Sequence, residues 1–266
     1  MRADIGWSLI SGAGEALVFE SLKKDKIEHK FKHLMSNISI ADEVSTLIGM
    51  VFSSAIIYFS TIQNTFYIAT GIMFLTLIYG SLALREVRVH ETAAKKIAAE
   101  IENQPQPNFK RISNFLSKHK DYILIMIIFA CLYESGRVLW QPQLLSVGIK
   151  LEYLGIIYAL LKLFSILGSI AARKVATSKK TFFYLGVVSA CIFLLMGSSS
   201  MPLVLLSFAA YFFVENITRV LQSDYLNGIA ESRNRATFLS SNSLVQNSFS
   251  SSYTVLIGYV GQYMLF

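Results

Sequence analysis

Apolar runs of membrane-spanning length alternate in this chain with two kinds of gap, one rich in basic residues and the other almost free of charge. Four gaps together hold 19 of the 24 Lys and Arg residues, namely 23–32, 85–120, 173–180 and 233–235. The gaps between them, 61–65, 141–152 and 197–202, hold only one Lys and one Glu. Basic residues concentrate in the cytoplasmic loops of membrane proteins. The pattern therefore predicts a chain that crosses a membrane repeatedly, with its basic loops in the cytoplasm.

Each apolar run is long enough to cross a bilayer as a helix, which takes about 20 residues. The clearest runs are 44–62, 65–84, 122–140, 153–172, 181–197 and 203–229. A Ser-rich run, 238–266, is less apolar, and the opening run, 5–22, is short and interrupted by Glu15 and Glu20. Because backbone groups in lipid must bond within their own segment, we expect helices throughout. The expected fold is an all-α membrane protein with seven spans and a weaker first one.

Composition excludes several other classes of protein. The chain is 53% hydrophobic and only 15% charged, which is unusual for a soluble domain of 266 residues. Its net charge of +7 lies beside the ends of the spans, so we expect anionic lipid headgroups and not nucleic acid as the counter-charge. Cys131 and Cys191 both lie inside apolar runs and lack a metal-ligand spacing, so we expect neither a disulfide nor a metal site.

The longest gap divides the chain. Residues 85–120 are soluble in character, with an expected short helix over 92–103 that the Gln-Pro-Gln-Pro run at 104–107 ends. We therefore expect a group of three spans in residues 1–84, a cytoplasmic loop in 85–120 and a group of five spans in 121–266.

Several ionisable side chains fall inside the spans, where burial of an ion costs about 3 kcal/mol or more. They include Glu15, Glu134, Arg137, Glu215 and Arg219. Such groups usually face a bundle interior or a wet cavity, so a pathway for substrate or ions is one interpretation. The other is structural, because the spacings i,i+3 and i,i+4 let the four paired residues neutralise one another on a helix face. Glu15 has no such neighbour.

Other polar residues of the spans allow two readings as well. Lys162 shares a helix face with Ser165 and Ser169, which favours a helix-packing surface over a ligand site. The amides of Gln141, Asn242 and Gln246 either line a cavity or bond neighbouring helices. No phosphate-binding Gly-rich loop, metalloprotease motif or nucleophile elbow is present, so we expect neither an enzyme nor a cofactor.

Two stretches resemble transporters of the major facilitator superfamily. Residues 11–22, Ser-Gly-Ala-Gly-Glu-Ala-Leu-Val-Phe-Glu-Ser-Leu, resemble helix four of that family and the start of the loop after it. Residues 231–240, Glu-Ser-Arg-Asn-Arg-Ala-Thr-Phe-Leu-Ser, resemble the loop before helix eleven. The loop at 85–120 falls where the family joins its two six-helix halves. The resemblance implies that the spans are helices four to eleven of a twelve-helix bundle, which makes this an incomplete bundle and the chain a fragment.

The resemblance also implies which helices face the substrate. Helices one, four, seven and ten line the central cavity in the family. This places Glu15 on helix four, the pair Glu134 and Arg137 on helix seven, and the pair Glu215 and Arg219 on helix ten. The chain departs from the family pattern at 168–180, where the basic residues of the signature loop are kept but its Asp is missing.

The family implies a multi-pass secondary transporter of the cell membrane, in a drug-efflux-like branch, that moves a small molecule by alternating access. Protons are the expected coupling ion. Glu15 would titrate, and Arg137 or Arg219 would hold a counter-charge or an anionic group of the substrate. The alternative is a truncated, non-transporting membrane protein derived from the same fold.

Overall fold

The structure is a computed structural model, and it describes residues 14–59, 62–83, 117, 120–150, 153–230 and 235–264. Every regular element among these residues is a helix. Residues 14–24 are helical, and the remaining elements are η1 (Glu28–Lys30), α2 (Phe31–Phe59), α3 (Ile62–Ala83), α6 (Lys120–Ser146), α7 (Leu154–Ala172), α8 (Lys179–Met196), α9 (Met201–Ile229) and α10 (Arg235–Met264). The expected helix at 92–103 and the proline run at 104–107 lie outside the described residues.

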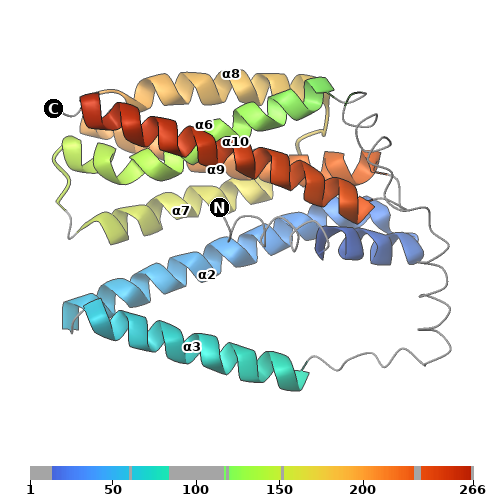
Figure 1. Cartoon of the computed structure of the whole chain (residues 1–266), viewed down its shortest axis with the longest axis horizontal. Helices are drawn as coiled ribbons and strands as arrows, with labels where there is room; N and C mark the ends of the chain where they lie inside the picture. Colours follow the sequence, from blue (N-terminus) through green and yellow to red (C-terminus); the bar gives the residue numbers. More distant parts are fainter. Residues whose placement is uncertain are drawn as a thin grey trace.

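The long helices run back and forth along one direction, so the chain reverses at two opposite ends of the molecule (Figure 1). The basic segments 23–32 and 173–180 lie at one end, where α2, α6 and α8 begin and α7 and α9 finish (Figure 1). The last residues of α2, α6 and α8 and the first residues of α3, α7 and α9 lie at the other end, next to the weakly charged gaps of the sequence (Figure 1). The alternation of charge along the sequence thus becomes a separation of charge between two ends of a bundle.

Within the described residues, four helices are long and apolar enough to cross a membrane: α6, α7, α8 and α9. The α3 helix contributes a shorter apolar stretch, Phe66–Tyr79. These findings confirm the expected all-helical membrane fold, although helix bounds differ from the apolar runs. The largest difference is in α2, which begins at Phe31, well before the expected span at 44–62.

The α9 helix lies at the centre of the bundle. Of its most apolar window, 61% is buried, against 22% for α8. It packs against α2, α6, α7 and α8. Two apolar clusters share its length, one around Tyr122, Phe129 and Leu221 and the other around Leu144, Phe208 and Tyr211. One helix therefore organises the packing at both ends of the molecule.

The α3 and α8 helices expose large apolar side chains. Phe66, Met73 and Leu82 of α3 and Tyr184 and Leu194 of α8 are each exposed by more than 60%. The main contacts of α3 are with α2, and it lies apart from the rest of the bundle in Figure 1. Surfaces this apolar are stable in lipid, where exposure of hydrocarbon carries no cost. These two helices therefore have the surface expected of helices that face lipid.

A glycine allows α7 and α9 to approach closely. A Cβ atom on Gly168 would lie 2.2 Å from the backbone oxygen of Phe213. That oxygen belongs to a helix backbone and cannot turn aside as a side chain would. The two helices can therefore come this close only because Gly168 has no side chain.

We expect Gly168→Ala to lower the stability of the purified protein by about 1–3 kcal/mol, the usual cost of overpacking a core. Thermal unfolding in detergent measures the effect. Gly186→Ala is the matched control, because its Cβ would lie 3.8 Å from Phe129, an ordinary contact. Alanine favours a helix over glycine by up to about 1 kcal/mol, so the control should unfold at an equal or higher temperature. Equal behaviour of the two variants would contradict the close approach.

Candidate functional site

A cavity of about 750 Å³ lies between the helical residues 14–24, α2, α6, α7 and α9. It is rich in charge for a space enclosed by membrane helices. Its ionisable lining residues are Glu15, Asp42, Glu43, Arg137, Lys162, Glu215 and Arg219. Apolar and aromatic side chains, Phe212 and Tyr158 among them, complete the wall. A cavity of this size with a few convergent polar groups is typical of small-molecule sites.

A buried ion pair joins α2 to α7 at the cavity wall. The Lys162 Nζ atom lies 2.9 Å from Glu43 Oε2, and the two side chains are only 10% and 2% exposed. The ammonium group also lies over the ring of Phe212, 4.9 Å from its centroid. Cation–π attraction strengthens when the cation is desolvated. Lys162 therefore has an ionic partner that the helix-packing interpretation of the sequence did not include.

A second ionic contact joins α2 to α9. Arg219 Nη1 lies 3.5 Å from Asp42 Oδ2, and Arg219 Nη2 lies 3.7 Å from Glu215 Oε1. The spacing of Glu215 and Arg219 on one helix predicts their pairing, and the structure confirms it. Asp42 is additional, and it makes Arg219 a bridge between two helices.

Glu15 is held by neutral donors. The Ser223 hydroxyl donates to Glu15 Oε2 at 2.6 Å, and the Asn227 amide donates to the same oxygen at 3.2 Å. Among the described residues, no Lys or Arg forms an ion pair with it. Both donors belong to α9, so Glu15 fastens the first helical segment to the central helix. A carboxyl group held in this way can gain or lose a proton without breaking an ion pair.

The other residues predicted for the site lie at its edge or away from it. Arg137 lines the cavity and lies 3.5 Å from Glu134, which does not line it. Gln141 is exposed near the end of α6, and Asn242 and Gln246 lie on α10 outside the cavity wall. The structure thus brings Glu15, Arg137, Glu215 and Arg219 together and leaves the amides outside.

A row of small polar side chains continues the contact between α2, α7 and α9 toward the basic end. Ser36 donates to the carbonyl oxygen of Ser169 at 2.6 Å, and the hydroxyls of Ser39 and Ser169 are 3.0 Å apart. Ser39 also donates to Asn216 Oδ1 at 3.1 Å. We call Ser36, Ser39, Ser169 and Asn216 the polar seam. The packing role predicted for the Ser residues of α7 is fulfilled at this seam by Ser169.

Glu43 and Asp42 are the residues that sequence reasoning missed. Both precede the apolar run at 44–62, so they look like the polar flank of a span. Because α2 begins at Phe31, they lie in the middle of a long helix instead. The signal that could have found them is Lys162, since an ammonium group inside a membrane needs an acidic partner. Among the described residues, no group of His, Cys, Asp and Glu could hold a metal ion.

We expect Glu43→Gln to destabilise the protein by about 3–5 kcal/mol, because it leaves the buried ammonium group of Lys162 without a counter-charge. Thermal unfolding in detergent measures the loss. The double variant Glu43→Gln/Lys162→Met removes both charges and should regain most of the stability.

Glu134→Gln is the control for this experiment. It breaks a pair whose Arg137 side chain is 67% exposed, so its cost should stay below about 1 kcal/mol. If Glu134→Gln and Glu43→Gln lost equal stability, the buried pair would be no more important for stability than the exposed pair.

Comparison with known proteins assigns the family. The family model described as the Major Facilitator Superfamily matches residues 7–253, which covers nearly the whole chain. No curated protein and no solved structure matches the chain. The family match agrees with the apolar helices and with the charged cavity between them. The chain belongs to the major facilitator superfamily, a family of membrane transporters.

Proposed function

We propose that this protein is a secondary transporter of the cell membrane that exports a small molecule by alternating access in exchange for protons. The observation that carries the proposal is the wall of the 750 Å³ cavity, to which two groups of helices contribute. Residues 14–24 and α2 form one side, and α6, α7 and α9 form the other. A site at the boundary between two bundles can open to either side of the membrane when the bundles rock.

The helix order supports a specific correspondence. The helical residues 14–24 and the helices from α2 to α10 follow the order of helices four to eleven of the family, with residues 85–120 as the link between bundles. Residues 1–84 then belong to the N-terminal bundle and residues 121–266 to the C-terminal bundle. In this assignment the basic end is cytoplasmic, as the distribution of Lys and Arg predicts.

The ionic contacts of the cavity could couple substrate binding to movement of the two proposed bundles. The Glu43–Lys162 and Asp42–Arg219 pairs join the two proposed bundles across their boundary. A substrate with a charged group would compete for one partner of such a pair, so substrate binding would change what holds the bundles together. Arg137 and Arg219 are the side chains suited to an anionic group of a substrate, since a guanidinium binds oxygen anions in a fixed geometry.

Glu15 is the proposed proton carrier. It lines the cavity, and its bonds to Ser223 and Asn227 cross the same boundary. A proton on Glu15 would turn its carboxyl group into a donor and change these bonds. Protonation therefore acts on a contact between the two proposed bundles.

We expect Glu15→Gln to abolish uphill transport driven by a pH gradient, while downhill exchange of substrate continues. The amide cannot release a proton, but it keeps the size of the carboxyl group. The measurement is accumulation of fluorescent compounds, tested as a panel of cationic, neutral and anionic dyes, in proteoliposomes with and without a pH gradient. Glu28→Gln is the control, because Glu28 is an exposed carboxylate of η1 outside the cavity. Full proton coupling in Glu15→Gln would disprove this role, and a wild type that moves no compound would favour the non-transporting alternative.

We expect a covalent link across the polar seam to stop transport. The Ser39 and Ser169 hydroxyls are 3.0 Å apart, so cysteines at these positions can form a disulfide after small rotamer changes. The variant Ser39→Cys/Ser169→Cys is made in a Cys131→Ser/Cys191→Ser background, which removes the two native thiols. Oxidation should block transport and reduction should restore it. Each single-cysteine variant is a control, and transport by the crosslinked protein would contradict separation of the bundles at the seam.

A further inference from the structure

A second cavity, of about 620 Å³, lies at the basic end of the molecule between the start of α2 and the end of α7. We call it the basic pocket. Five of its eight lining residues are basic: His29, Lys30, Lys32, His33 and Arg173. Leu22, Leu34 and Asn37 are the other described lining residues, so no carboxylate of the described part of the chain contributes to the pocket. It is separate from the charged cavity, with which it shares no lining residue.

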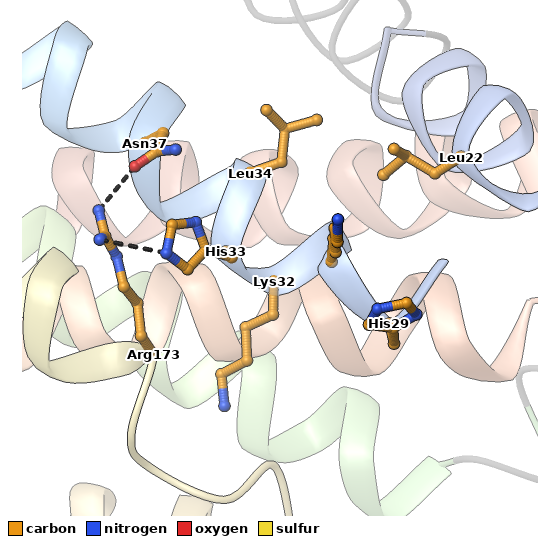
Figure 2. A pocket seen from close by; sticks show the side chains of 8 residues that line it. Leu22, His29, Lys32, His33, Leu34, Asn37 and Arg173 are labelled. Atoms are coloured by element: carbon orange, nitrogen blue, oxygen red, sulfur yellow. Dashed lines mark hydrogen bonds between the residues drawn. The ribbon is translucent and has the colours of Figure 1, made fainter. Parts of the chain in front are cut away.

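The guanidinium group of Arg173 is held in place by three side chains of α2. Its Nε donates to Ser36 Oγ at 2.8 Å and its Nη2 to Asn37 Oδ1 at 2.6 Å, while Nη1 lies 3.4 Å from His33 Nε2. Figure 2 shows the contacts with Asn37 and His33, which hold the end of the side chain against α2. No carboxylate among the described residues pairs with Arg173. A guanidinium has five N–H donors, so two remain for another ligand after these contacts.

The neighbouring cations differ in how far their charge is balanced. Lys32 donates to the carbonyl oxygen of Val175, and it lies close enough to Asp224 for their charges to interact. Lys30 is exposed, and no described carboxylate pairs with it. The pocket therefore holds at least two cations, Lys30 and Arg173, without an acidic partner among the described residues. Such an excess of positive charge attracts an anion and is stabilised by it.

The chemistry of the lining indicates which anion fits. Arginine forms parallel hydrogen bonds to phosphate, and lysine adds a point charge to the same group. The two leucines provide an apolar wall beside the cations, as an acyl chain or glycerol group requires. The basic end is also where the helices that carry the pocket leave their apolar spans. We propose that the basic pocket binds a phosphate group, carried by an anionic phospholipid or by a free phosphate.

The experiment compares two variants that each lose two positive charges. Lys30→Gln/Arg173→Gln removes the unpaired cations of the pocket, and Lys24→Gln/Lys180→Gln removes exposed cations of the same end that do not line it. The lipid arm places each protein in nanodiscs of phosphatidylcholine with phosphatidylglycerol and counts retained phosphatidylglycerol by native mass spectrometry after detergent extraction. The phosphate arm titrates inorganic phosphate in detergent without anionic lipid and records thermal stability.

We expect the wild type and the control variant to bind phosphate groups equally, and the pocket variant to bind them at least about tenfold more weakly, as loss of charge-assisted hydrogen bonds predicts. Retention of phosphatidylglycerol without stabilisation by inorganic phosphate identifies a lipid headgroup, and the reverse identifies a free phosphate. Binding in neither arm, or equal loss in both double variants, would overturn the proposal. Lys30→Gln alone, compared with Lys24→Gln alone, gives the same test without altering the contacts of Arg173.

Discussion

A cation buried between membrane helices needs an opposite charge nearby, and this constraint selects the packing of the central helices. The α2 helix supplies Asp42 and Glu43, whereas α7 and α9 supply Lys162 and Arg219. Each pair joins segments far apart in the sequence. Removal of Glu43 leaves the buried ammonium group of Lys162 without a counter-charge, whereas apolar contacts between helices in lipid are less selective. The ion pairs therefore specify which helix faces meet, and apolar packing fills the space around them.

The polar seam joins α2, α7 and α9 by hydrogen bonds of modest strength. Hydrogen bonds between membrane helices contribute about 0.6 kcal/mol on average, so the polar seam can open at small cost. Gly168 lets the backbones of α7 and α9 come close, and that contact lies on one side of the proposed boundary between bundles. Close backbone packing is thus found within a proposed bundle, whereas hydrogen bonds of modest strength and the Glu43–Lys162 ion pair lie across the boundary. This distribution suits a protein whose two parts move as bodies.

Hydropathy predicts the all-helical membrane fold, because each span must satisfy its backbone within lipid, although only four of the described helices are long and apolar enough to cross a membrane. It also locates Glu15, Arg137, Glu215 and Arg219, since an ion inside an apolar run is conspicuous. It fails at Glu43, because a hydropathy run ends where charge begins, whereas the α2 helix continues past the charge to Phe31. The amides of Gln141, Asn242 and Gln246 lie outside the cavity. Burial of an amide costs less free energy than burial of an ion, so an amide within a span is weaker evidence for a functional site.

Basic residues that orient a chain in the membrane need no acidic partner for that role, and at the basic end some of them have none among the described residues. Arg235 pairs with Glu20, and Lys32 has Asp224 nearby, whereas Arg173 is held by neutral groups. Arg173 belongs to the α7 side of the proposed boundary, and Lys30 belongs to the α2 side. A phosphate group bound to both would favour the arrangement in which the two sides are close. Because coupling between a ligand and a conformation is reciprocal, a substrate that separates the two sides would lower the affinity of the pocket for the phosphate group. Positive charge that orients the chain in the membrane would then also make its conformational equilibrium sensitive to the anions at that surface.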